Sequence, residues 1–144
     1  MPNKIDYTNK YKCRVLVCWV KHKNKFLLLK RSDKVLAYKN MWSSLAGFLD
    51  DEKSLEEKVK EELQEEIGIS EKNIIKIIPG KTYEMIDEKI NRKWITHPVL
   101  CEVNTDQVRL DWEHTGYKWV TEGEFDNFEI VPNSLKAFEI LVRR

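Results

Sequence analysis

The sequence is poor in the residues that build disulfide frameworks and linkers. Its three cysteines form no C-x-x-C pair, and their odd number argues against a disulfide framework. Cys13, Cys18 and Cys101 each lie in an apolar stretch, which predicts buried free thiols and a reducing, cytoplasmic compartment. Five glycines and four prolines are too few and too scattered to mark a domain boundary. We therefore expect one domain over residues 1–144.

Long apolar runs and an excess of one charge are also missing. No apolar segment is long enough to cross a membrane, and the first residues contain no apolar core of a signal peptide. The formal net charge is +1, although 34% of the residues are charged. Because a nucleic-acid binder usually carries a basic excess, we expect no nucleic-acid polymer and no membrane as partner.

Strand-forming residues dominate two parts of the chain, and each part is followed by a helical pattern. The last helix is predicted to begin at Pro132, and its apolar side is predicted to contain Leu135, Phe138 and Leu141 together with Ala137. This order predicts an α/β (α+β) fold in which helices pack on a mixed sheet. The predicted strands are 12–20, 25–31, 45–49, 73–78, 81–86, 93–103, 107–110 and 117–120, with a loop at 34–44.

The clearest helix is predicted between residues 55 and 67. Ser54 is a suitable N-cap, and Glu57 three residues later completes a capping box. Gly68 stands where a glycine commonly ends a helix. Apolar residues recur every four positions and form one stripe, which consists of Leu55, Val59, Leu63 and Ile67.

Acidic residues crowd the face of this helix beside the apolar stripe. Glu62 and Glu66 lie four residues apart, and Glu65 is three residues from Glu62. Carboxylates at this spacing repel one another, and a divalent cation removes the repulsion. Oxygen ligands suit Mg²⁺ or Mn²⁺ better than Zn²⁺. Glutamate-rich helices are also common on solvated surfaces, where Lys58 and Lys60 would pair with the acids, and charge spacing alone favours that alternative.

The wider segment resembles the Nudix box of the Nudix hydrolase (MutT-like) superfamily, G-x5-E-x7-R-E-U-x-E-E-x-G-U, where U is apolar. Gly47 matches the first glycine, and residues 62–69 match the E-U-x-E-E-x-G-U end of the pattern. The resemblance extends to the flanking segments 26–31 (FLLLKR), 42–47 (WSSLAG) and 113–120 (EHTGYKWV). It implies the Nudix fold, an α/β/α sandwich with helices on both sides of a mixed sheet.

Two positions depart from the pattern of the box. Lys53 stands where the pattern has glutamate, and Glu61 stands where it has arginine. In the family this arginine holds the glutamates through an ion pair. The departures are opposite in sign, as if the two charges had been exchanged, which is compatible with an ion pair between Lys53 and Glu61. Glu52 is a neighbouring acid that could replace the missing glutamate after a shift in register.

The resemblance implies divalent-metal-dependent hydrolysis of a phosphoanhydride bond in a nucleoside diphosphate linked to another group. Nucleoside triphosphates and dinucleoside polyphosphates are the candidate substrates. By position in the box, the carboxylates of Glu62, Glu65 and Glu66 would bind Mg²⁺ or Mn²⁺ and act in catalysis. The carbonyl of Ala46 would be a backbone ligand. Glu113 is the candidate general base, and its alternative role is that of an ordinary exposed acid before a strand.

Further residues are candidates for substrate binding. Gly47 would let its loop lie close to the metal and the phosphates. Arg31 and Lys39 could contact phosphate or ribose, although surface cations near strand ends are equally often structural. Trp42 and Tyr83 offer rings on which a base could stack, although packing in the sheet is the more frequent role of such rings.

The main alternative to an enzyme is a Nudix-fold nucleotide-binding or regulatory protein with weak catalysis. Lys53 and Glu61 favour this alternative, whereas the intact glutamates of the box oppose it. In either case a nucleotide is the expected partner. Many members of the superfamily are dimers, so a homodimer is also considered.

Overall fold

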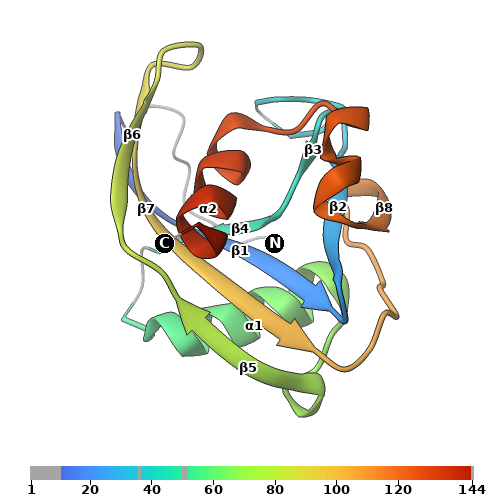
Figure 1. Cartoon of the computed structure of the whole chain (residues 1–144). Helices are drawn as coiled ribbons and strands as arrows, with labels where there is room; N and C mark the ends of the chain where they lie inside the picture. The colour runs from blue at the N-terminus through green and yellow to red at the C-terminus, as the bar shows by residue number, and fades with distance from the viewer. Residues whose placement is uncertain (1–10, 36, 50–51, 144) are drawn as a thin grey trace.

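The computed structural model of the chain describes residues 11–35, 37–49 and 52–143 (Figure 1). Its elements follow the predicted order, and their bounds differ from the predicted ones by a few residues at most of the ends. The strands are β1 (Lys12–His22), β2 (Lys25–Arg31), β3 (Trp42–Ser43), β4 (Leu45–Phe48), β5 (Ile74–Pro79), β6 (Tyr83–Asp87), β7 (Arg92–Val103) and β8 (His114–Val120). The helices are α1 (Leu55–Ile67) and α2 (Pro132–Val142), with short 3₁₀ segments η1 (Glu71–Asn73) and η2 (Glu122–Asn127).

The strands form one mixed sheet built around β1 and β7, which are parallel neighbours. The other edge of β1 pairs with β2 at their shared hairpin and with β4 nearer the start of β1. β7 pairs on its second edge with β5 and β6, and β2 pairs further with β3 and β8. β1 and β2 therefore diverge after their hairpin, and the segment that contains β3 and β4 occupies the opening between them.

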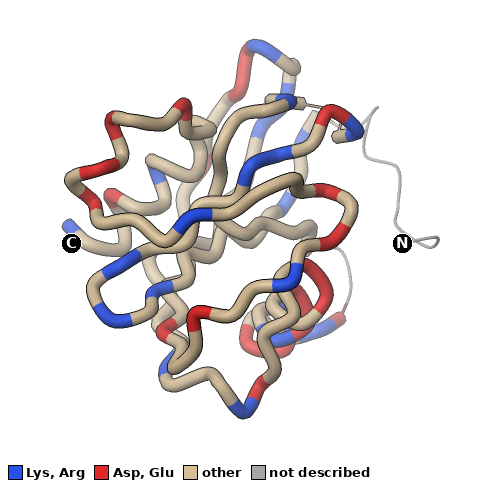
Figure 2. The backbone as a smooth tube through the Cα atoms, turned by 90° about the vertical axis from the view of Figure 1, so that its right-hand side faces the viewer, with Lys and Arg blue, Asp and Glu red and all other residues tan. Residues whose placement is uncertain are grey.

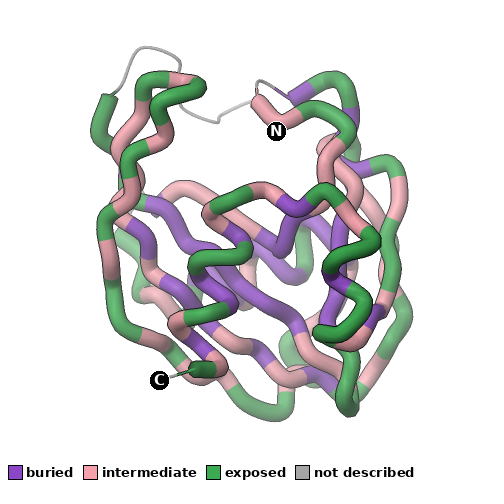
Figure 3. The backbone as a smooth tube through the Cα atoms, turned by 45° about the horizontal axis from the view of Figure 1, so that its top comes forward, coloured by how far each residue is buried: buried purple, intermediate pink, exposed green. Residues whose placement is uncertain are grey.

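Both faces of β1 are buried, which explains its uninterrupted apolar run. Leu16 and Cys18 belong to a core cluster shared with α1, which we call the α1-side core. Val17 and Trp19 belong to a second cluster shared with α2, the α2-side core. The two helices thus cover opposite faces of the sheet (Figure 1), and buried residues concentrate along its middle strands (Figure 3). The predicted α/β/α sandwich with a mixed sheet is confirmed.

The strand predicted at 107–110 is wrong, because this segment has no regular secondary structure. Val108 and Leu110 pack against the α1-side core, whereas Arg109 between them is exposed. The backbone N–H of Arg109 donates to the carbonyl of Ile67 at 2.9 Å. The alternating pattern therefore comes from a loop that packs along the end of α1. The short strand β3 lies within the segment that was predicted as a loop.

The apolar side predicted for the last helix is partly wrong. Phe138 and Leu141 are buried, but Leu135 is exposed and Ser134 is buried in its place. The carbonyl of Ser134 accepts a hydrogen bond of 2.8 Å from the indole of Trp19, and its hydroxyl accepts one of 3.1 Å from the N–H of Ser44. Because these hydrogen bonds satisfy Ser134, α2 can turn this polar residue toward the sheet.

One expectation from composition is met in the described residues. Cys13, Cys18 and Cys101 are buried thiols that form no disulfide within the described residues, as predicted. None of the helices within 11–35, 37–49 and 52–143 combines the length and the apolarity that a membrane crossing requires. The extent of a single domain over residues 1–144 stays a prediction.

Candidate metal and catalytic site

Helix α1 begins and ends as its sequence predicts. The hydroxyl of Ser54 accepts a hydrogen bond of 3.1 Å from the N–H of Glu57, and the Glu57 carboxylate accepts one of 2.9 Å from the N–H of Ser54. At the other end Gly68 has a φ of 68°, a left-handed conformation that glycine adopts without strain. These two ends fix which residues of α1 face the sheet.

Beside its apolar stripe, α1 buries a second row of residues that all carry charges. Lys58, Glu62 and Glu66 follow one another every four positions and are only 6%, 2% and 2% exposed. Lysine and glutamate are almost never buried to this extent unless they are paired or bind a ligand. Glu61 borders this row and is half-buried, and Glu65 is exposed. The buried charged row therefore distinguishes α1 from an ordinary solvated helix.

Gly47 of β4 makes room for the Glu62 carboxylate. A Cβ atom at position 47 would lie 2.7 Å from Cδ and 2.8 Å from Oε1 of Glu62. A Cβ carbon does not approach other heavy atoms this closely, so any side chain at position 47 would displace the carboxylate. The requirement for glycine is thus steric, and it joins β4 to the buried row of α1.

Glu66 belongs to a group of three acids from two parts of the chain. One carboxylate oxygen from each of Glu66, Asp111 and Glu113 lies within 4.8 Å of the other two. Burial raises the pKa of Glu66 well above its usual range, and a hydrogen bond with the Glu62 carboxyl and the surrounding negative charges raise it further. Figure 2 shows acidic residues on α1 and on the neighbouring segment before β8.

The segment before β8 holds its acids in place through local hydrogen bonds. Oδ1 of Asp111 accepts a hydrogen bond of 3.1 Å from the N–H of Glu113 and lies 3.2 Å from Nδ1 of the buried His114. The carbonyl of Glu113 accepts a hydrogen bond of 2.8 Å from the N–H of Ser32. Because β8 pairs with β2 in this region, with His114 opposite Arg31, the end of β2 lies beside the acids.

Arg31 is the predicted substrate-binding cation that this pairing brings to the acids. Its Nε donates a hydrogen bond of 3.1 Å to the carbonyl of Ala37. Burial lowers the pKa of Arg31, and the negative charges of Glu113 and Glu66 offset part of this effect. Lys39, the second predicted cation, lies exposed in the loop between β2 and β3.

The two exchanged charges of the box contact each other. Lys53 forms an ion pair with Glu61, a contact with which the opposite signs of the two departures are compatible. Nζ of Lys58 lies 3.1 Å from Oε1 of Glu61 and 3.7 Å from Oε1 of Glu62. The acid at position 61 is therefore flanked by two ammonium groups, and the second of them also reaches the buried row.

The donor set fits a hard divalent cation. Among the residues that the structure describes, Oε2 of Glu62 and Oε2 of Glu66 are buried without a hydrogen-bond partner. Carboxylate oxygens buried in this way cost free energy, which an oxygen-binding cation would recover. A further group, with one oxygen each from Glu61, Glu62 and Glu65, also lies within 4.8 Å. Mg²⁺ and Mn²⁺ both match ligands that are all oxygens.

The aromatic residues predicted to bind a base belong to the other face of the sheet. Trp42 and Tyr83 pack against the α2-side core, as does Ala46. The ring of Trp42 meets the ring of Phe128 edge-on, with 5.1 Å between centroids. The hydroxyl of Tyr83 donates a hydrogen bond of 2.7 Å to Oδ1 of Asn133, and burial raises the pKa of this tyrosine. The predicted site residues thus form an acidic group and an aromatic group.

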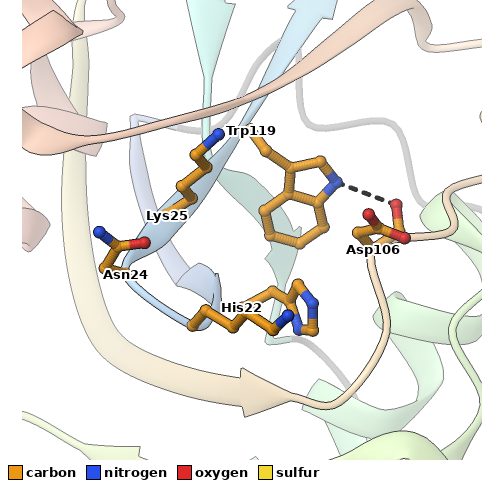
Figure 4. A pocket seen from close by; sticks show the side chains of 6 residues that line it. His22, Asn24, Lys25, Asp106 and Trp119 are labelled. Carbon is orange, nitrogen blue, oxygen red and sulfur yellow. Dashed lines mark hydrogen bonds between the residues drawn. The ribbon is translucent and has the colours of Figure 1, made fainter.

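A separate pocket lies at the opposite end of β2 and β8. It has a volume of about 210 Å³ and contains the ring of Trp119, whose Nε1 donates a hydrogen bond of 3.0 Å to the carbonyl of Asp106 (Figure 4). Phe26 pairs with Val120 at this end of the two strands, whereas Arg31 pairs with His114 at the acidic end. The pocket is therefore distinct from the group of acids.

The comparison with known families decides the classification of the chain. The family model of the NUDIX domain matches residues 10–139. The chain belongs to the Nudix family. No curated protein shows significant sequence similarity to it. The predicted family is therefore confirmed, and so is the prediction of an enzyme of the Nudix pyrophosphohydrolase class.

Solved Nudix structures share the fold over nearly the whole chain. The MutT protein from Methanosarcina mazei Go1 is 25% identical, with a TM-score of 0.70 over 94% of this chain and 96% of that chain. The NUDIX domain of Shewanella oneidensis NrtR, complexed with ADP ribose, is 18% identical, with a TM-score of 0.77 over 99% and 94%. A bifunctional NMN adenylyltransferase/ADP ribose pyrophosphatase from Francisella tularensis, complexed with AMP and a Mn ion, is 17% identical, with a TM-score of 0.71 over 92% and 41%.

Two residues near the proposed ligands are not predicted by the sequence. The spacing of Lys58 and Glu62 predicts an ordinary pair on a solvated helix, although a spacing of four from Glu62 and eight from Glu66 places Lys58 in the same row. The signal for Asp111 is its position two residues before the candidate base Glu113. Both residues become apparent only when burial and hydrogen bonding are known.

Proposed function

We propose that this Nudix protein hydrolyses a phosphoanhydride bond in a nucleoside diphosphate linked to another group and requires Mg²⁺ or Mn²⁺. One observation carries the proposal: Glu62 and Glu66 each bury a carboxylate oxygen that lacks a hydrogen-bond partner within the described residues. A solvated acidic helix would not bury such groups, because water would leave no oxygen unsatisfied. A cytoplasmic location and a homodimer remain predictions of the sequence.

The residues of α1 and β4 would hold the cation. Glu62 and Glu66 are the proposed ligands from the buried row, with Glu65 at its outer border and the carbonyl of Ala46 as a further donor. A divalent cation bound here would neutralise the charge that develops on the phosphoryl oxygens. Gly47 contributes by leaving space for the Glu62 carboxylate.

The segment before β8 would supply the base. In the proposed reaction a water oxygen forms a bond to phosphorus, the anhydride P–O bond breaks, and the leaving phosphate departs with the electron pair. Glu113 is proposed to accept the proton of that water at its carboxylate. Asp111 would keep the loop in position, because its Oδ1 accepts a hydrogen bond from the backbone of Glu113.

Substrate contacts are proposed from cations near the acidic group and from the aromatic residues on the α2 side. Arg31 lies beside the acids and is suited to a phosphate, since its guanidinium stays charged at neutral pH. Lys39 is proposed as a second phosphate or ribose contact from its exposed loop. Trp42 and Tyr83 are proposed to contact the base from the α2 side. Nucleoside triphosphates and dinucleoside polyphosphates are the first candidate substrates.

The test measures turnover with and without Mg²⁺ or Mn²⁺ by chromatographic separation of the products, because hydrolysis of a diphosphate such as ADP-ribose releases no inorganic phosphate. The panel contains nucleoside triphosphates, ADP-ribose, NADH and dinucleoside polyphosphates. We expect metal-dependent turnover of at least one compound, and a loss of about 100-fold or more in Glu66→Gln, which keeps the shape of the side chain but removes its charge. Glu56→Gln is the matched control, because Glu56 lies in the first turn of the same helix and is exposed.

Two results would contradict the proposal. Metal-dependent turnover that survives in Glu66→Gln would place the chemistry away from the buried row. No turnover of any compound, with the same nucleotides still raising the thermal stability, would indicate a nucleotide-binding Nudix protein. Lys53 and Glu61 are the observed departures that favour this second candidate.

A further inference from the structure

A buried lysine stands next to the proposed metal ligands. Lys58 is 6% exposed, and its ammonium group lies 3.7 Å from Oε1 of Glu62. Removing an ammonium group from water is strongly unfavourable unless nearby carboxylates compensate for it. If this face of α1 were an ordinary solvent-exposed surface, the flexible side chain of Lys58 would extend into water. The position of Lys58 therefore calls for an explanation that the proposed function does not supply.

Four charged residues contact one another in succession, and cations alternate with anions along this series. Lys53 pairs with Glu61, Glu61 pairs with Lys58, and Lys58 approaches Glu62. We call these four residues the charge ladder. The last member of the ladder is Glu62. Its Oε1 lies toward Lys58, whereas its Oε2 is buried without a hydrogen-bond partner in the described part of the chain. The ladder thus fixes one oxygen of Glu62 and leaves the other for a ligand.

We infer that Lys58 is a positioning residue of the metal site and takes the place of the arginine that the Nudix box has at position 61. This inference rests on the proposed function, because it assumes that Glu62 binds the cation. In the charge ladder Glu61 cannot hold Glu62 directly, since both are anions. Lys58 lies between them and contacts both, so the exchange of charges at positions 53 and 61 depends on the lysine at position 58.

Two opposite effects of Lys58 on the bound cation can be separated. Its positive charge repels a divalent cation, so charge alone predicts that Lys58→Met tightens Mn²⁺ binding. Its contact with Oε1 of Glu62 orients the ligand, so positioning predicts that Lys58→Met weakens binding. Groups that orient metal ligands commonly change metal affinity by about 10–100-fold. We expect the orienting effect to prevail, because Glu62 is buried and its carboxylate lies close against the backbone at Gly47, which leaves it little room to move.

The first experiment measures Mn²⁺ binding to the metal-free protein by the electron paramagnetic resonance signal of free Mn²⁺. Lys58→Met is expected to weaken binding by about 10-fold, and Lys58→Arg is expected to restore most of it. Lys60→Met is the matched control, because Lys60 lies on the same helix and pairs with Glu56 and Glu71 instead. In turnover, Lys58→Met should lower kcat more than it changes KM.

The second experiment remains decisive even when Lys58→Met folds poorly. The charge-restored variant combines Lys53→Glu with Glu61→Arg and thereby places a guanidinium beside the Lys58 ammonium. We expect this variant to be less stable than the wild type and to bind Mn²⁺ more weakly. Adding Lys58→Met to it should improve both properties, so the effect of the same substitution changes sign between the two backgrounds.

The outcomes distinguish this inference from the proposed function. If the wild type binds no Mn²⁺ and shows no metal-dependent turnover, the proposed function fails. If the wild type binds Mn²⁺ and Lys58→Met binds it equally well or more tightly, only the positioning role is overturned. An unchanged sign of the Lys58→Met effect in the charge-restored variant would also overturn it.

Discussion

The two helices cover opposite faces of one sheet but bury very different side chains. Within the described part of α1, the row of Lys58, Glu62 and Glu66 is buried alongside Val59, Leu63 and Ile67 of the apolar stripe. In α2 the buried residues are Ser134, Ala137, Phe138 and Leu141. Burial of apolar surface stabilises a fold, whereas burial of charge opposes it unless a ligand compensates. The comparison teaches that α2 serves mainly stability, while α1 gives up some stability to bury charged side chains beside the sheet.

The largest expected effect comes from the α2 side. Phe138 is 1% exposed, and its ring packs against those of Trp19, Phe26 and Phe125 at centroid distances of 5.1, 4.9 and 4.9 Å. Phe138→Ala should lower the free energy of unfolding by about 4 kcal/mol, measured by urea denaturation. The exposed Leu135 offers the control, and Leu135→Ala should change the free energy by less than about 0.5 kcal/mol. Equal effects of the two substitutions would contradict the packing of α2 described here.

A smaller effect is expected where β4 meets the buried row of α1. Gly47→Ala places a methyl group 2.7 Å from Cδ of Glu62, so the carboxylate must move. We expect a loss of about 2 kcal/mol in stability, the typical cost of overpacking, together with weaker Mn²⁺ binding. Calorimetric titration and thermal unfolding measure the two effects. Gly116→Ala is the matched control, because its new Cβ atom would have 3.8 Å to the nearest atom, on Lys30.

The smallest effect has the opposite sign and sharpens the contrast between the helices. In the metal-free protein Glu66→Gln removes a buried acid whose pKa is raised by burial and by the carboxyl groups of Glu62, Glu113 and Asp111. Its free energy of unfolding should therefore rise by about 1 kcal/mol, although we expect the same substitution to lower turnover by about 100-fold or more. Chemical denaturation in the presence of a chelator measures this gain. A destabilised metal-free Glu66→Gln would show that the carboxylate has a structural role.

Local signals in the sequence predict the framework of the site well. The capping box of Ser54 and Glu57 and the glycine at position 68 set the ends of α1 as expected, because they act through hydrogen bonds within a few residues. The alternation of apolar and polar residues at 107–110 predicts a strand wrongly, because a loop that packs against the end of α1 produces the same pattern. Hydrophobic periodicity indicates that one side of a segment is buried, but it does not identify the type of secondary structure.

Long-range proximity could not be predicted from the chain alone. Asp111 and Glu113 reach Glu66 only because β8 pairs with β2 and the preceding loop follows α1. Lys58 resembles any helix-surface lysine until its burial is known. Conversely, Trp42 and Tyr83 suggested a base platform by their type, and the fold assigns them to the packing of the α2 side. Their role toward a substrate stays a prediction.

The charge ladder also bears on how sequence motifs are written. A motif specifies each position independently, so a search that demanded glutamate at position 53 and arginine at position 61 would discard this chain. The contacts show that positions 53, 58 and 61 are linked, since the acid at 61 is flanked by the lysines at 53 and 58. A description in terms of paired charges would retain chains of this kind, and it would predict that substitutions at the three positions occur together in related sequences.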